Sequence, residues 1–288
     1  MHQTKMIALD LDGTTLRTDG TLSDAVKTAM EQAIAEGVHV VIASGRPLEG
    51  LPAAVTSIEG ISYAVVSNGA GVYHMKNKEC IWSKNLPANA VSMAVSAAEA
   101  WGYTMEFFLR GSAYGAADYI ADPAKYGRSE QFVSYVQSTR IPIADVQTFI
   151  RENEGCFDSI ALICPEMREK RQVMERLRRM LPDVYVTTSG GDLIELMHRD
   201  TGKAKGLEVL AEICGIAPKE IAAFGNGDND ADMLSYAGSG FAVENASVLC
   251  KESSDYLVNS NDEDGVADGI RMLLRQRNYG EKEEAVAD

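Results

Sequence analysis

Short apolar runs alternate with helical patterns over the first third of the chain, and this order limits the folds that the chain can adopt. One amphipathic segment, residues 22–37, has apolar positions at helical spacing, Ser23 as a candidate N-cap and Gly37 as a candidate stop. Strand, helix and strand repeated in this way predict an α/β fold with a doubly wound parallel sheet. We expect its buried strands at residues 5–11, 38–45 and 63–73.

The middle of the chain has a different pattern, in which helices, short segments and a hairpin are mixed. We expect a helix at 85–102, short segments at 103–109 and 112–120, and then an irregular stretch to about Ile143. A strand at 156–164, a helix at 165–181 and a hairpin at 183–197 should follow. The first pattern returns after residue 198 and ends with a helix near 265–277. The sequence therefore predicts a core domain formed by residues 1–84 and 199–288, with an inserted α+β domain at residues 85–198.

The composition argues against several classes of partner. A formal net charge of -15 leaves no basic face for nucleic-acid phosphates, so we expect no nucleic-acid partner, although a small phosphorylated substrate stays open. No apolar run approaches the roughly 20 residues of a membrane span and no secretory signal pattern is present, so we expect no membrane contact. The five cysteines are scattered without a Cys-x-x-Cys pair, which favours reduced thiols and a cytoplasmic location.

Polar residues follow the predicted strands at the point where each strand ends. Asp10 and Asp12 come at the end of the first apolar run, where two like charges are costly to desolvate, so we expect a cation or a chemical role beside them. Ligands of open α/β sheets bind at the carboxyl ends of the strands, so the polar groups should meet at one edge. The four groups are Asp10 with Asp12, Ser44-Gly45-Arg46, Ser67-Asn68-Gly69, and residues 225–230. Lys203 follows the inserted domain, where the sheet pattern resumes.

Each of these groups, taken singly, has a simpler interpretation. Asp-Gly and Asn-Gly are common turn dipeptides, and Ser44 or Asn68 could cap a helix or a turn. The aspartates within 228–232 match the first ligand spacings of an EF-hand loop, but Met233 and Ser239 stand where that loop needs a glycine and a bidentate glutamate. We therefore reject a calcium loop, and turn chemistry alone does not explain four groups at one edge.

Five short motifs, in their order and spacing, resemble the haloacid dehalogenase (HAD) superfamily and, within it, the Cof-type capped phosphatases. DLDGTTL resembles the opening D-x-D-G-T motif, ASGRP the [ST]-G-R-P motif, and SNGA a further Cof-type signature. GKAKGLEVLAEICGI resembles the lysine motif, and FGNGDNDADML the final acidic motif. The resemblance covers essentially the whole chain, and it implies a HAD-like core in which the inserted domain is a cap that governs substrate specificity.

The resemblance also implies a phosphatase that works through an aspartyl-phosphate. Asp10 would be the nucleophile, and Asp12 would protonate the leaving oxygen and then activate water. Ser44 and Lys203 would act as further catalytic residues by holding the phosphate oxygens. The implied substrate-binding residues are Gly45, Arg46, Asn68, Gly69 and Asn229. The implied Mg²⁺ ligands are Asp10, Asp12 through its backbone carbonyl, Asn226 and Asp230.

Two assignments depend on details of these motifs. The family's spacing from the lysine to the leucines that follow fits Lys203 and does not fit Lys205. Asn226 stands where the family has its first acid, and an amide oxygen can bind Mg²⁺ but brings no charge. Asp230 or Asp228 could supply the carboxylate directly or through water, so the third metal ligand stays open.

The leading hypothesis is a Mg²⁺-dependent phosphatase acting on a small phosphorylated metabolite, such as a sugar phosphate or a phosphorylated cofactor. One alternative is a phosphomutase that uses the same intermediate, and another is a catalytically weak binding or regulatory protein, which Asn226 alone favours. We expect a monomer or a homodimer. The cap should recognise the substrate, and its polar and aromatic candidates are Arg110, Tyr114, Tyr126 and Arg128.

Overall fold

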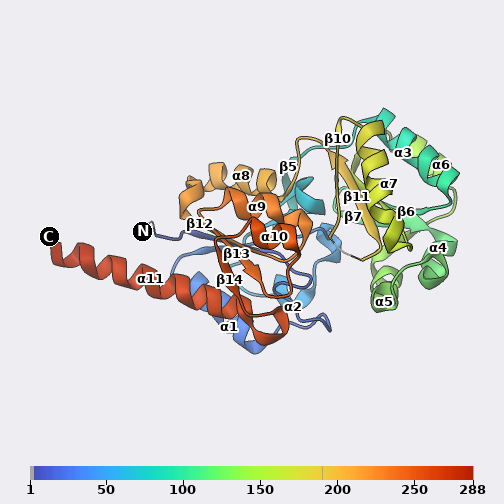
Figure 1. Cartoon of the computed structure of the whole chain (residues 1–288). Coiled ribbons are helices and arrows are strands. Elements are labelled where there is room, and N and C mark those ends of the chain that lie inside the picture. Colours follow the sequence, from blue (N-terminus) through green and yellow to red (C-terminus); the bar gives the residue numbers. More distant parts are fainter. Residues whose placement is uncertain (1–2, 190, 288) are drawn as a thin grey trace.

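A computed structural model describes residues 3–189 and 191–287, which form two parts built on separate sheets (Figure 1). The larger part, the core, has an eight-stranded sheet in the order β14-β13-β12-β1-β2-β3-β4-β5. Its strands are β1 (Met6–Leu9), β2 (His39–Ala43), β3 (Tyr63–Val66), β4 (Gly71–His74), β5 (Glu79–Ser83), β12 (Ile221–Gly225), β13 (Ser239–Val243) and β14 (Tyr256–Val258).

The strands from β14 to β3 run parallel, which confirms the predicted doubly wound α/β fold. β1 and β12 are buried along their whole length, as expected for a sheet covered on both faces. β4 and β5 add an antiparallel edge, because the chain turns back within residues 67–70 and leaves no room for a crossover helix. The core helices are α1 (Asp24–Ala35), α2 (Ala53–Thr56), α8 (Lys203–Cys214), α9 (Ala231–Tyr236), α10 (Val248–Glu252) and α11 (Gly265–Ala287).

Local signals explain where these helices begin and end. The Ser23 hydroxyl accepts a hydrogen bond from the Val26 N–H at 3.1 Å and caps α1 as predicted, and Gly37 follows the helix with φ of 78°. Pro52 precedes α2, which is 4 residues long. In Figure 1, α8 and α9 lie on one side of the core sheet, α1 and α11 lie on the other, and α11 extends beyond it.

The second part, the cap, is an α+β unit with a six-stranded sheet in the order β10-β11-β9-β6-β7-β8. β10 and β11 form the predicted antiparallel hairpin. The strands are β6 (Thr104–Leu109), β7 (Ser112–Ala116), β8 (Arg140–Ile143), β9 (Phe157–Ile163), β10 (Val184–Thr187) and β11 (Leu193–His198). The helices are α3 (Ala88–Trp101), α4 (Ala117–Ala121), α5 (Glu130–Thr139), α6 (Val146–Glu152) and α7 (Met167–Met180).

The stretch expected to be irregular, from the end of α4 to Ile143, is in fact structured, because it contains α5 and β8. Asp122 and Pro123 open a short 3₁₀ segment that ends at Gly127 with φ of 88°, and this turn separates the two helices. The Tyr-, Gly- and Pro-rich turn hides the helical spacing on either side of it. α5 is only 10 residues long, so its pattern is too short to stand out.

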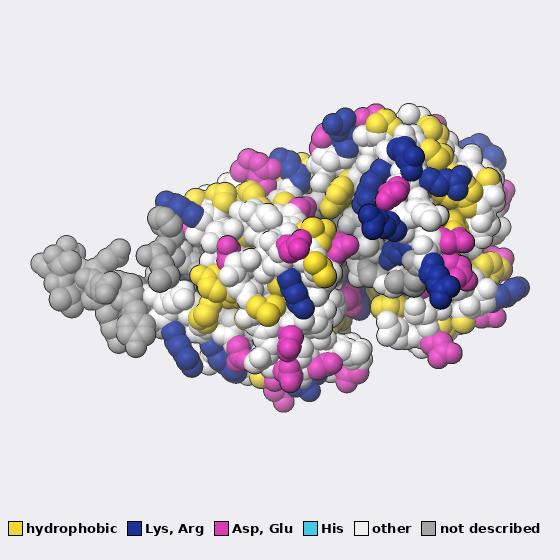
Figure 2. All heavy atoms as spheres, viewed as in Figure 1, with side chains coloured by type: hydrophobic (Ala, Val, Ile, Leu, Met, Phe, Trp, Pro, Cys, Tyr) yellow, Lys and Arg dark blue, Asp and Glu magenta, His cyan; other side chains and the backbone are white. Residues whose placement is uncertain are grey.

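Each part has its own hydrophobic core, one around each sheet. The predicted boundaries after residues 84 and 198 fall in the two connections between the sheets, and they remain our proposed division of the domains. Figure 2 shows the hollow between the two parts, with Lys and Arg side chains grouped over the cap near α7. Within the described residues, none of the helices combines the length and hydropathy that a membrane crossing requires.

Candidate active site

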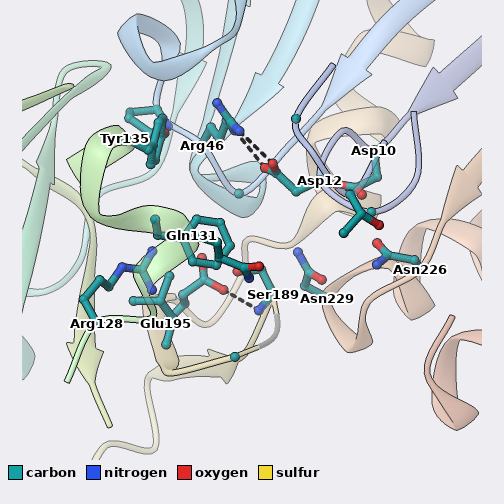
Figure 3. Close-up of a pocket in the computed structure, with 18 of the residues that line it drawn as sticks. Asp10, Asp12, Arg46, Arg128, Gln131, Tyr135, Ser189, Glu195, Asn226 and Asn229 are labelled. Atoms are coloured by element: carbon teal, nitrogen blue, oxygen red, sulfur yellow. Dashed lines mark hydrogen bonds and ion pairs between the residues drawn. The ribbon is translucent and has the colours of Figure 1, made fainter. Parts of the chain in front are cut away.

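The predicted polar groups meet at the carboxyl edge of the core sheet. β1 and β12 are neighbours, and the chain leaves them toward opposite sides of the sheet, so the crevice between them is a topological switch point. Asp10 directly follows β1 and Asn226 directly follows β12, while Ser44 and Ser67 follow β2 and β3. Figure 3 shows Asp10 and Asn226 close together at this edge.

Lys203 joins two deeply buried acids at this edge. It begins α8, is fully buried, and donates from Nζ to Asp10 Oδ1 at 2.7 Å and to Asp230 Oδ1 at 2.5 Å. The other Asp230 oxygen accepts the backbone N–H groups of Asn226 and Gly227 at 2.9 and 2.8 Å. Both oxygens of Asp230 are therefore engaged, and this residue holds the loop that follows β12.

The charge balance around Asp10 is negative. Lys203 supplies one positive charge against the carboxylates of Asp10 and Asp230, which leaves one net negative charge when both are ionised. Burial, followed by the charge of Asp230, raises the pKa of Asp10 to about 7, although Lys203 opposes the shift. Lys203 engages one Asp10 oxygen, and within the described chain no hydrogen bond engages the other. A cation beside this carboxylate would correct the imbalance.

Asn226 lies in a closely packed loop beside Asp10. Its amide oxygen accepts a hydrogen bond from the Thr14 hydroxyl at 2.9 Å. A Cβ at Gly13 would lie 2.5 Å from the Asn226 amide nitrogen, and Gly13 has φ of 76°, so this position requires glycine. In the part of the chain that the structure describes, no three His, Cys, Asp or Glu side chains are grouped to hold a metal ion. A metal at this edge would therefore need mixed ligands, a carboxylate with amide and backbone oxygens.

Asp12 is bound by Arg46 and not by Lys203. Arg46 Nε and Nη2 donate to the two Asp12 carboxylate oxygens at 2.8 and 2.7 Å, and Arg46 Nη1 donates to the Gly50 carbonyl at 3.0 Å (Figure 3). The contact with Asp12 is bidentate, which fixes direction as well as distance. The Asp12 side chain stays 42% exposed, so the pair lies at the wall of a cavity and not in the core.

The chain makes a left-handed turn after β3. Ser67, Asn68 and Gly69 have φ of 49°, 53° and 87°, a conformation that is costly for the first two residues. At Gly69 a Cβ would lie 1.8 Å from the carbonyl oxygen of Gly202, so no larger residue fits. The turn therefore packs against the residue that precedes Lys203 and supports the position of that lysine.

Hydrogen bonds link this turn to the cap. Asn229 Nδ2 donates to Asn68 Oδ1 at 2.8 Å, and Asn68 Nδ2 donates to Oε1 of Glu195, on β11, at 2.8 Å. The other Glu195 oxygen accepts the Ser189 N–H at 2.7 Å. Burial raises the pKa of Glu195. These contacts join the cap to the core beside the carboxyl edge of the sheet.

A cavity of about 560 Å³ lies between the core and the cap. Six of the predicted site residues line it: Asp10, Asp12, Gly45, Arg46, Asn226 and Asn229. Five others are buried and do not line it: Ser44, Asn68, Gly69, Lys203 and Asp230. Of the cap candidates, Arg128 lines the cavity, whereas Arg110, Tyr114 and Tyr126 do not.

Sequence reasoning missed several cap residues near the cavity, namely Glu106, Glu195, Tyr135 and Arg140. Glu106 and Glu195 could have been identified, because each is the single acid within an apolar strand run, YTMEFFL or LIELM. Tyr135 and Arg140 lie in the stretch that was expected to be irregular and carried no signal of this kind.

The chain matches the haloacid dehalogenase-like hydrolase family over residues 7–270. It is 28% identical over 274 residues to the 5-amino-6-(5-phospho-D-ribitylamino)uracil phosphatase YitU of Bacillus subtilis, covering 91% of this chain and 94% of that protein. It is 27% identical over 269 residues to YcsE, a phosphatase of the same description from the same organism, covering 93% of this chain and 94% of that protein.

Solved structures agree with these matches. A haloacid dehalogenase-like hydrolase from B. subtilis is 26% identical with a TM-score of 0.79, covering 93% of this chain and 99% of that one. Another from Bacteroides thetaiotaomicron is 26% identical with a TM-score of 0.77, covering 94% of this chain and 100% of that one. The chain therefore belongs to the haloacid dehalogenase-like hydrolases, and within them it is a phosphoric monoester hydrolase.

Proposed function

We propose that this phosphatase hydrolyses a small phosphorylated metabolite with the help of Mg²⁺, through a phosphoryl group carried on Asp10. The position of Asp10 is the observation that supports this proposal most. Asp10 follows β1 at the switch point and lines the cavity, and Lys203 engages only one of its oxygens. The second oxygen is then available to attack phosphorus.

In the proposed reaction an Asp10 oxygen attacks phosphorus, and the bond from phosphorus to the leaving oxygen breaks. The leaving oxygen keeps the electron pair of that bond and takes a proton from Asp12. In the second step water attacks the phosphorus and gives a proton to Asp12, and the bond to Asp10 breaks with its electron pair returning to Asp10. Lys203 offsets charge on the phosphoryl oxygens, where a buried cation acts strongly.

The proposed Mg²⁺ ligands are the Asp10 carboxylate, the Asp12 backbone carbonyl and the Asn226 amide oxygen. The negative balance at Asp10 and the set of hard oxygen donors fit a divalent cation of this kind. When bound, the ion would bring phosphate oxygens to the site and offset their charge. Asp230 would act on the ion through the loop that carries Asn226, because Asp230 is fully buried behind the cavity that Asn226 lines, with its oxygens held by Lys203 and by two backbone N–H groups.

The charges on the cap side of the cavity favour a substrate whose leaving group carries no strong charge of its own. Arg128 is paired with Asp192, and Arg140 with Glu106, so the two cap arginines that line the cavity are already neutralised. A sugar phosphate or a phosphorylated cofactor with a neutral polar end fits this balance. Since two relatives are named as phosphatases of a ribitylaminouracil phosphate, such a polyol phosphate belongs in the first substrate panel.

The experiment is phosphate release from a panel of phosphorylated sugars and cofactors, with and without Mg²⁺. We expect release that requires Mg²⁺ and that Asp10→Asn abolishes in a folded protein, because an amide cannot accept the phosphoryl group. Intact mass after acid quench should show one phosphoryl group on the wild type and none on Asp10→Asn. Lys205→Ala is the control for a substitution at the surface of α8, where Lys205 pairs with Glu208 at 2.5 Å.

Each alternative function has its own outcome in the same experiment. Phosphate that stays on a rearranged organic product would indicate a phosphomutase. Binding of the esters by a folded wild type, without turnover of any of them, would indicate a binding or regulatory protein. Turnover by Asp10→Asn at the wild-type rate would show that Asp10 is not the nucleophile.

A further inference from the structure

A chain of contacts runs from the interior of the cap to Asp12. Its last cap residue is Tyr135 on α5, whose ring centre lies 4.4 Å from the guanidinium carbon of Arg46 (Figure 3). Arg46 in turn donates to both oxygens of Asp12 and to the carbonyl of Gly50. A Cβ at Gly50 would lie 2.6 Å from the Tyr135 hydroxyl, so the two segments pack tightly here. The cap helix therefore covers the arginine that holds Asp12.

The ring of Tyr135 is held from inside the cap. The guanidinium carbon of Arg140 also lies over this ring, 4.7 Å from its centre, and Arg140 Nε and Nη2 donate to Glu106 Oε2 at 3.0 and 2.6 Å. The other Glu106 oxygen accepts the Tyr119 hydroxyl at 2.6 Å. Glu106 and Tyr119 are fully buried, so the cap interior sets the position of the Tyr135 ring.

Stacking explains what the ring does for Arg46. An arginine side chain has many rotamers, whereas a packed tyrosine has few, so a guanidinium stacked on the ring loses most of its orientations. The orientation that remains aims Nε and Nη2 at Asp12, as a bidentate pair requires. A cap that moved away from the core would remove this support from Arg46.

We propose that Tyr135 is a positioning residue: it fixes Arg46, and through Arg46 it orients the Asp12 carboxylate for hydrolysis of the phosphorylated enzyme. The inference rests on the proposed function, which assigns Asp12 to take a proton from the attacking water. The arginine fork holds both Asp12 oxygens in one direction, and activation of water depends on that direction, whereas departure of a group that needs no proton does not. Loss of the ring should therefore slow the second chemical step more than the first.

The kinetic test compares Tyr135→Leu, which removes the ring, with Tyr135→Phe, which keeps it. The substrate is 4-nitrophenyl phosphate, whose leaving group needs little protonation. We expect Tyr135→Leu to form the phosphorylated enzyme normally and to hydrolyse it about 10-fold more slowly, a part of the roughly 10²- to 10⁴-fold that acid–base catalysis supplies. The signature is a burst of nitrophenolate near one per active site, a slow steady state and a KM that does not rise. Tyr135→Phe should keep the wild-type rate.

Two controls separate this role from general damage to the cap. Trp101→Leu removes another cap ring that stacks on an arginine, Arg176 at 4.5 Å from the ring centre, but does not line the cavity, and it should behave as the wild type. In an Asp12→Asn background, Tyr135→Leu should cause no further loss of rate, because the group that it positions is gone. A further loss in that background, or an equal loss of burst amplitude and steady-state rate, would overturn the inference.

A second measurement does not depend on turnover. Urea unfolding of Tyr135→Leu, Arg46→Met and the double variant should give non-additive shifts of the midpoint, because both substitutions break one contact. Additive shifts would overturn the inference even in an enzyme that hydrolyses phosphate esters. If the wild type forms no phosphorylated enzyme, the proposed function is wrong, and so is the step that Asp12 is proposed to catalyse. The unfolding of the single and double variants would still decide whether Tyr135 fixes Arg46.

Discussion

Asp10→Asn should stabilise the metal-free protein even though it abolishes turnover. Burial, and then the charge of Asp230, raises the pKa of Asp10 from 3.8 to about 7. One pKa unit corresponds to about 1.4 kcal/mol, so ionised Asp10 costs the folded state up to about 4 kcal/mol at pH 8. Asparagine keeps the shape, can still accept a hydrogen bond from Lys203 and carries no charge. Since Lys203 loses some attraction as well, we expect a gain of about 1 to 4 kcal/mol.

The pH dependence of this gain has a definite sign. Because the pKa of Asp10 is raised on folding, the folded protein holds this proton more tightly than the unfolded chain between about pH 4 and pH 7. The contribution of Asp10 to stability therefore falls as pH rises through this window and is constant above it. The advantage of Asp10→Asn should be complete above about pH 7 and should disappear near pH 4.

Urea unfolding with a metal chelator, at several values between pH 4 and pH 8, measures this gain. Asp12→Asn is the matched control, because it removes the same charge from the same loop but from an acid that Arg46 already pairs. It should be neutral or destabilising by about 1 kcal/mol. Saturating Mg²⁺ should reverse the order of Asp10→Asn and the wild type, since a ligand that binds only the folded state stabilises it. An Asp10→Asn protein that is less stable than the wild type at pH 8 without metal would refute the charge balance proposed for Asp10.

Three further substitutions test other parts of the site. Lys203→Ala should lose at least about 100-fold in kcat/KM, whereas Lys205→Ala should change it little, and similar losses in both would contradict the assignment. Asn226→Asp should lower the Mg²⁺ concentration that gives half the maximal rate, because it adds a charged ligand; a higher or unchanged value would show that Asn226 is not a ligand. Gly69→Ala should lower the free energy of unfolding by about 3 kcal/mol or more in urea denaturation, because the new Cβ would meet backbone 1.8 Å away. Gly37 also has a positive φ, but a Cβ there would point into open space. Gly37→Ala should therefore cost about 1 to 2 kcal/mol, and an equal cost at both glycines would refute the steric argument.

The core half of the site could be predicted because its residues stand at strand ends. In a parallel sheet every carboxyl end reaches the same edge, whatever the separation along the chain, so Asp10 and Asn226 meet once their strands are recognised. The roles of the buried residues behind that edge could not be predicted in this way. Both oxygens of Asp230 accept hydrogen bonds, and the backbone at Gly69 packs closely against Gly202. Both features depend on packing between distant segments.

The cap half could not be predicted for a different reason. Periodicity reports which face of an element is buried, but it does not report which charged partner a buried side chain meets. Glu106 and Arg140 are 34 residues apart and pair across β6 and β8, two strands that are not neighbours in the cap sheet. Tyr135 lies on a helix too short for a clear pattern. Its contact with Arg46 exists only because the cap docks on the core.

The arrangement of charges explains how an acidic chain can bind an anionic substrate. Asp12, Asp192 and Glu106 each face an arginine of their own, so these pairs contribute little net field to the cavity. Asp10 differs, because it shares Lys203 with Asp230 and keeps a negative balance. A divalent cation added there would turn one net negative charge into one net positive charge, at the atom proposed to attack phosphorus. The formal charge of -15 is then irrelevant to phosphate binding, since the local field at Asp10 decides it.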